Sequence, residues 1–119
     1  VEAMSMGGRE KGGLGGGAIV NMSSLAAMIG SAHLVAYGAS KGAVRQMTKS
    51  VAIDCARKGL GIRCNSVHPG MIVTDMGDQV LRLGGGDAEK RFASRMRLIP
   101  MGEPGQALGI LQRGFHFWR

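Results

Sequence analysis

The sequence predicts an α/β protein, and three successive segments carry this prediction. AIVNMSS, at positions 18–24, is a short apolar run rich enough in Ile and Val for a buried strand. From Ala36 onward, apolar residues recur at three- and four-residue steps, which is typical of one face of a helix about 20 residues long. GIRCNSVHPG then predicts a second buried strand at positions 62–67, which is stopped by Pro69 and Gly70. Strand, helix and strand in this order predict a parallel crossover unit.

The central helix and the segments after it can be delimited further. Gly59 follows the last apolar position and is expected at the C′ position of the helix. Two short amphipathic helices are expected in TDMGDQVLRL and DAEKRFASRMRLIP, with Asp87 as the N-cap of the second. The last residues follow no recognisable period. The apolar face of the central helix is predicted to consist of Ala39, Ala43, Val44, Met47, Val51 and Cys55.

Length and composition bound the class of protein. A chain of 119 residues with 45% hydrophobic residues is long enough for one modest globular domain. No run of about 18 apolar residues is present, so we expect no membrane segment. The chain starts with Val1 and has no secretory signal pattern, which leads us to expect a fragment or a processed chain.

The formal charge of +7 raises the possibility of a nucleic-acid partner. The positive residues are scattered, however, and the densest group, at 90–97, is interrupted by Phe92 and Met96 at helical spacing. This pattern is typical of a solvated amphipathic helix, so we expect no nucleic-acid binding.

The cysteines and histidines show no metal-ligand spacing. Cys55 and Cys64 lack the spacing of a zinc site and are expected to be small buried residues in a reducing compartment such as the cytoplasm. His33, His68 and His116 share no ligand pattern either. The sequence therefore predicts no metal site.

A glycine-rich stretch matches the letters of a dinucleotide-binding motif. GLGGGA, at 13–18, fits G-x-G-x-x-G/A, but that motif functions only after a strand and at the start of a helix. Here the glycines precede a strand, and residues 1–11 resemble the tail of a helix. We interpret the stretch as a connection.

The single tyrosine, Tyr37, lies four residues before Lys41 on the predicted helix. Residues at i and i+4 share a helix face, so the phenol and the ammonium can point into one site. A nearby cation lowers the pKa of a phenol and allows general acid/base chemistry near neutral pH. Ser23 and Ser24, at the end of the first strand, could supply a hydroxyl donor. By spacing alone, a packed tyrosine beside a solvated lysine is the simpler interpretation.

Three longer sequence segments, taken in order, favour the catalytic interpretation of Tyr37 and Lys41. GGAIVNMSS, YGASKGAVRQMTKSVAIDCA and GIRCNSVHPGMIVTDM together resemble the short-chain dehydrogenase/reductase family. The resemblance is close over positions 16–76 and looser to about 105. It implies a doubly wound, Rossmann-like parallel sheet, of which the chain would hold a partial version truncated at both ends.

The resemblance also implies roles for particular residues. Ser24 would hydrogen-bond the substrate oxygen, and it fits the family spacing better than Ser23. Tyr37 would be the general acid/base in the interconversion of a secondary alcohol and a ketone. Lys41 would lower the pKa of the tyrosine and bind the ribose of NAD or NADP. The nicotinamide pocket would be lined by Pro69, Gly70, Ile72 and Thr74; Pro69-Gly70 as a plain turn and Thr74 as a helix N-cap are the simpler alternatives.

The expected organisation follows from the same comparison. Residues 1–17 would be the end of a helix and a glycine-rich loop, and residues 18–76 the catalytic core. Residues 77–105 would be substrate-loop helices, with a divergent tail at 106–119. The apolar residues expected to cover a substrate or pack the lid are Met71, Met76, Val80, Leu81, Leu83, Met96 and Leu98.

The resemblance leads to expectations for the isolated chain and for an intact family member, and it leaves one alternative. The nucleotide-binding half of the family fold is expected to be absent, so the chain alone is expected to be poorly stable and nearly inactive. An intact family member is expected to be a homo-oligomer that acts on a small alcohol or ketone. The alternative is a non-catalytic fragment that docks on a full-length subunit.

Overall fold

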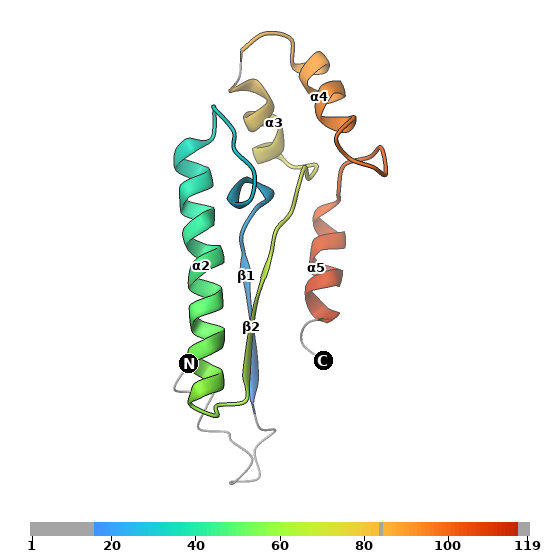
Figure 1. Cartoon of the computed structure of the whole chain (residues 1–119). Coiled ribbons are helices and arrows are strands. Elements are labelled where there is room, and N and C mark those ends of the chain that lie inside the picture. The colour runs from blue at the N-terminus through green and yellow to red at the C-terminus, as the bar shows by residue number, and fades with distance from the viewer. Residues whose placement is uncertain (1–15, 84, 117–119) are drawn as a thin grey trace.

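A strand–helix–strand unit forms the centre of the computed structural model, which describes residues 16–83 and 85–116 (Figure 1). Strands β1 (Gly17–Met22) and β2 (Ile62–Val67) pair in parallel, with Gly17 opposite Ile62 and Met22 opposite Val67. Helix α2 (Val35–Arg57) connects them. The predicted α/β class with parallel strands is confirmed, and the second strand has its predicted bounds.

The contact between α2 and the strands contains a small core of mixed polarity. Helix α2 packs against β2, and Cys55 on the helix and Ile62 and Cys64 on the strand are all buried. Thr48 is buried in the same layer. Its hydroxyl accepts a hydrogen bond from the side-chain amide of Asn21, on β1, at 2.9 Å. The Thr48 hydroxyl in turn donates to the Val44 carbonyl. The hydroxyl thus has both a donor and an acceptor partner, as a buried polar group requires.

The prediction that both cysteines are buried and free is confirmed. Burial raises the pKa of the Cys64 thiol above 9.0, and the neighbouring Cys55 adds to the increase. Because the thiolate is the reactive form of cysteine, a raised pKa keeps Cys64 protonated and inert at neutral pH. Cys64 also accepts a hydrogen bond from the Asn21 amide at 3.7 Å.

The predicted apolar face of α2 is only partly correct. Val44, Val51 and Cys55 are buried or half-buried, whereas Ala39, Ala43 and Met47 are exposed. The face toward the strands includes polar Thr48, while apolar residues continue around to the outer face. The apolar spacing along the sequence therefore spans two sides of the helix.

Two short helices after β2 agree with the sequence. Helix α3 (Asp75–Arg82) begins after Thr74, and α4 (Ala88–Met96) begins after Asp87, whose carboxylate accepts hydrogen bonds from the amides of Glu89 and Lys90. Gly59 follows the C-cap of α2 with φ of 62°, as expected for C′. A single 3₁₀ turn, η2 (Leu25–Ala27), follows β1.

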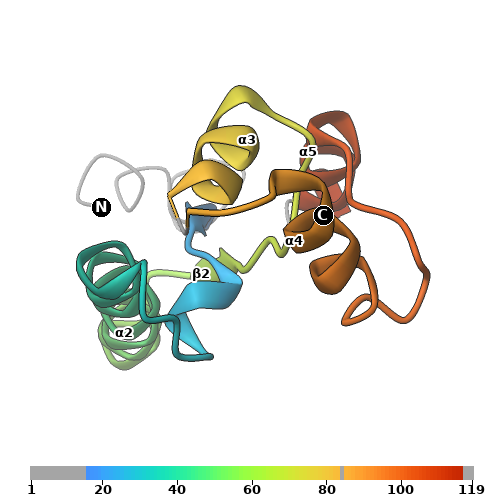
Figure 2. The same cartoon turned by 90° about the horizontal axis from the view of Figure 1, so that it is seen from above.

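The expected divergent tail contains a helix that the sequence did not predict. Helix α5 (Ala107–His116) lies on the opposite side of the strands from α2 (Figures 1 and 2). Just before it, Gly105 forms a parallel bridge with Ile72. The Val73 amide donates to the Gly105 carbonyl at 3.0 Å, and the Gly105 amide donates to the Met71 carbonyl at 2.9 Å. These bonds place the start of α5 beside the loop that follows β2.

Two further findings bear on the sequence predictions. Within residues 16–83 and 85–116, no helix is long and apolar enough to cross a membrane, and no three acidic, histidine or cysteine side chains gather as metal ligands. The predicted helical tail at 1–11 and the first three residues of GLGGGA lie outside the described residues.

The hydrogen bond from Asn21 generates a stability prediction. Asn21→Ala should lower the free energy of unfolding by about 1 kcal/mol, because a partly buried hydrogen bond between β1 and α2 is lost. Urea denaturation of the 119-residue chain, followed by circular dichroism, measures the change. Asn65→Ala is the matched control, since Asn65 on β2 is half-buried and has no side-chain hydrogen bond to a described residue. Equal losses in the two variants would contradict this account.

Candidate active site

The two serines after β1 have different environments. Ser23 is 2% exposed, and its hydroxyl donates to the Lys41 carbonyl at 2.9 Å. Ser24 is half-buried, and its Oγ accepts a hydrogen bond from the Ala26 amide at 3.2 Å, which caps η2. Because this bond uses only a lone pair, the Ser24 hydroxyl proton is free to be donated to a ligand. The geometry therefore favours Ser24 over Ser23 as a ligand-binding hydroxyl.

Tyr37 and Lys41 lie in the first two turns of α2 and are both half-buried. The Lys41 ammonium donates to the Met22 carbonyl at the end of β1, at 3.0 Å. The same nitrogen is 5.7 Å from the centroid of the Tyr37 ring, within the range of a cation–π contact. The ammonium thus lies between the end of β1 and the phenol ring.

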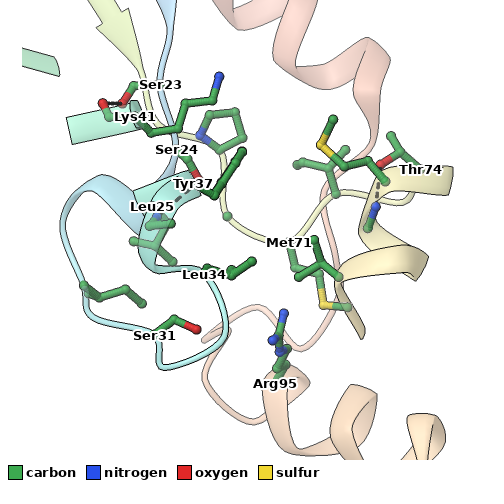
Figure 3. Close-up of a pocket in the computed structure, with 18 of the residues that line it drawn as sticks. Ser23, Ser24, Leu25, Ser31, Leu34, Tyr37, Lys41, Met71, Thr74 and Arg95 are labelled. Carbon is green, nitrogen blue, oxygen red and sulfur yellow. Dashed lines mark hydrogen bonds between the residues drawn. The ribbon is translucent and has the colours of Figure 1, made fainter. Parts of the chain in front are cut away.

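All the predicted site residues line one cavity of about 540 Å³ (Figure 3). Its polar wall comes from the end of β1 and the start of α2, and the loop after β2 forms an adjoining wall. The predicted residues that it brings together are Ser24, Tyr37, Lys41, Pro69, Gly70, Ile72 and Thr74.

Thr74 has the structural role considered as an alternative and also lines the cavity. Its Oγ1 accepts a hydrogen bond from the Gly77 amide at 3.1 Å and so caps the N-terminus of α3. The hydroxyl proton stays free, as in Ser24, so capping and ligand binding are compatible at this residue.

Residues 71–104, which we call the covering segment, contribute apolar side chains to the cavity, but not all of those that the sequence predicted. Leu81 is buried, Leu83 is 64% exposed, and neither they nor Met96 line the cavity. The predicted apolar residues that do line it are Met71, Met76, Val80 and Leu98. Arg95 also lines it, although the sequence placed this residue on a solvated face.

His68 supports Ser24 from behind the cavity. Its Nδ1 lies 3.2 Å from the Ser24 carbonyl oxygen, and its Nε2 lies 2.9 Å from the Ser66 hydroxyl. A carbonyl only accepts hydrogen bonds, so Nδ1 carries a proton, and in the neutral ring Nε2 accepts from Ser66. No local sequence pattern indicates this contact, because it joins residues 44 positions apart.

Comparison with known proteins identifies the family. A family model described as short chain dehydrogenase matches residues 6–82, and the chain belongs to this family. It is 45% identical over 91 residues to the NADP-dependent (R)-specific alcohol dehydrogenase of Lentilactobacillus kefiri, covering 76% of this chain and 34% of that protein. The chain thus spans about a third of the length of this relative.

Solved structures of the family share the fold. A short-chain dehydrogenase/reductase from Burkholderia xenovorans matches with a TM-score of 0.81 and 31% identity, over 98% of this chain and 41% of that one. NAD⁺-bound xylitol dehydrogenase matches with a TM-score of 0.68 and 30% identity, over 75% of this chain and 37% of that one. The aligned regions therefore extend beyond the central strand–helix–strand unit of this chain.

The His68 contact can be tested by stability. His68→Ala should lower the free energy of unfolding by about 2 kcal/mol, because two partly buried hydrogen bonds are lost together. His33→Ala is the control, since His33 is exposed in the loop before α2. Urea denaturation measures both variants, and a His33→Ala loss as large as that of His68→Ala would overturn the assignment.

Proposed function

We propose that this site belongs to an NAD- or NADP-dependent oxidoreductase that interconverts a secondary alcohol and a ketone. The observation that carries the proposal is the convergence of Ser24, Tyr37 and Lys41 on one wall of an apolar cavity. The relatives support the cofactor class, since one is named as NADP-dependent and one structure is described as NAD⁺-bound.

Each of the three residues has a distinct task in the proposed reaction. The Ser24 hydroxyl donates a hydrogen bond to the substrate oxygen and fixes its position. In the direction of reduction, the Tyr37 phenol gives its proton to that oxygen, and in the direction of oxidation its phenolate removes the proton. Lys41, whose ammonium lies beside the Tyr37 ring, stabilises the negative charge that develops on the phenolate.

The described residues fit the nicotinamide end of the cofactor. When bound, the cofactor supplies or accepts the hydride at the substrate carbon. Lys41 has a charged donor on the cavity wall for ribose hydroxyls, and the free hydroxyl proton of Thr74 could be donated to a carboxamide. Pro69, Gly70 and Ile72 supply the adjoining wall against which a flat ring could pack.

The state of the two cysteines bears on where the protein works in the cell. Cys55 and Cys64 are both free, which supports a reducing compartment such as the cytoplasm. We include this localisation in the proposal.

The Tyr37 role can be tested in a hybrid enzyme. Residues 16–105 of this chain would replace the corresponding segment of the Lentilactobacillus kefiri relative, so that the site is studied within a whole dehydrogenase. Tyr37→Phe should reduce kcat about 100-fold or more, the usual contribution of a general acid/base. Ser24→Ala should also reduce turnover, whereas Ser50→Ala, on the exposed side of α2, should not. A Tyr37→Phe hybrid with unchanged kcat would exclude the mechanism.

The isolated 119-residue polypeptide should show no measurable cofactor turnover. Among the described residues the sheet has only two strands, and only four apolar side chains are buried, namely Cys55, Ile62, Cys64 and Leu81. A parallel sheet is normally covered by helices on both faces and by further strands at its edges. An absorbance assay at 340 nm with a secondary alcohol tests this, and steady turnover by the purified chain would refute it.

A second candidate function has one specific observation in its favour. Met47 is 50% exposed and Ile53 is 53% exposed on the side of α2 away from the strands. This exposed apolar surface supports docking on another subunit, either within a homo-oligomer or as a non-catalytic fragment. Tyr37→Phe separates the two functions, because it should abolish turnover in the hybrid and leave docking through α2 unchanged.

A further inference from the structure

We propose that Arg95 binds a carboxylate on the substrate, so that the natural substrate pair is an oxo acid and the corresponding hydroxy acid. This inference rests on the proposed function, because it assigns the second end of the molecule whose carbonyl oxygen meets Ser24 and Tyr37. It concerns a residue of the covering segment and adds a substrate class to the proposed chemistry.

The position of Arg95 provides the first argument. It lies in the last turn of α4, is half-buried and lines the cavity. In Figure 3 its side chain extends from α4 toward Met71, whereas Ser24 and Tyr37 lie on a different wall. Apolar side chains line the space around these groups, so one substrate could meet a hydrogen-bonding pair at one end and a guanidinium at the other.

The charge balance of the cavity provides the second argument. Among the described residues, its lining includes two cations, Lys41 and Arg95, and no aspartate or glutamate. Lys41 has the Met22 carbonyl and the Tyr37 ring as partners, whereas the Arg95 guanidinium has no hydrogen bond or ion pair with any described residue. The half-buried guanidinium is therefore available to form charge-assisted hydrogen bonds with an anion that enters the cavity. A ligand anion would provide the missing partner.

The position of the guanidinium favours a carboxylate of the substrate over the diphosphate of the cofactor. The planar guanidinium fork matches a carboxylate with two parallel hydrogen bonds. In doubly wound folds, a dinucleotide diphosphate instead binds at the glycine-rich turn between the first strand and its helix. Arg95 lies in the segment after β2, beside the apolar residues that would surround a substrate.

Arg97 offers a matched control within the same segment. It is exposed, follows α4 by one residue and does not line the cavity. Because both residues are arginines, replacing either one with glutamine changes the net charge of the chain by the same amount. Any difference between Arg95→Gln and Arg97→Gln reports the position of the charge.

The test compares 4-oxopentanoate with its neutral isostere 4-oxopentanamide. Ligand-observed NMR measures their affinities for the 119-residue chain, and KM values are measured in the hybrid enzyme. We expect the oxo acid to be preferred at least about tenfold, which corresponds to about 1.4 kcal/mol. Arg95→Gln should remove the preference, Arg95→Lys should keep part of it, and Arg97→Gln should keep all of it.

The outcomes separate this inference from the proposed function. A Tyr37→Phe variant that loses turnover but keeps the Arg95-dependent preference in the binding assay supports both. A preference that persists while Tyr37→Phe leaves kcat unchanged supports the anion site and refutes the proposed catalytic role. The inference is overturned if neither protein shows an Arg95-dependent preference for the oxo acid. It is also overturned if inorganic diphosphate, and not the oxo acid, binds in an Arg95-dependent way.

Discussion

The arrangement of the site depends on a pair of reciprocal hydrogen bonds between the end of β1 and Lys41. The Ser23 hydroxyl donates to the Lys41 carbonyl, and the Lys41 ammonium donates to the Met22 carbonyl. The first bond fixes the helix backbone on the strand, and the second fixes the charged end of the side chain. Tyr37, one turn earlier, is therefore held near Ser24 without a direct bond between them. The buried serine is structural, and its neighbour is left available for a ligand.

Polar contacts below this pair explain why α2 has no simple apolar stripe. Asn21 on β1 donates both to Thr48 on α2 and to Cys64 on β2, so one amide joins all three elements. A buried hydroxyl requires such partners, and their directionality fixes the position of the helix along the strands more narrowly than apolar packing would. The buried and half-buried side of α2 consequently combines polar Thr48 with apolar Val44, Val51 and Cys55.

The sequence predicted those features whose causes are local. The bounds of β2, the N-cap at Asp87 and the glycine after α2 each depend on neighbours within a few residues. The contact of His68 with the Ser24 carbonyl and the direction of Arg95 depend on segments that are distant in sequence, and no local pattern indicates them. Helix α5 was missed because its sequence has no clear period and follows two prolines. Spacing alone did not single out Ser24, Tyr37 and Lys41; they were predicted from the resemblance to the short-chain dehydrogenase/reductase family, and all three line the cavity.

The bridge between Ile72 and Gly105 has a consequence for how the covering segment can evolve. Residues 74–104 leave the body of the protein and return to it at nearly the same point, where two backbone hydrogen bonds join the ends. A side chain at Gly105 would start with a Cβ only 2.6 Å from the Ile72 side chain, so glycine suits this crossing. With both ends fixed together, lengthening the segment adds only about 0.6 kcal/mol of closure entropy for each doubling. The segment can thus be exchanged as a unit, and selection can alter this part of the cavity lining without disturbing Ser24, Tyr37 and Lys41.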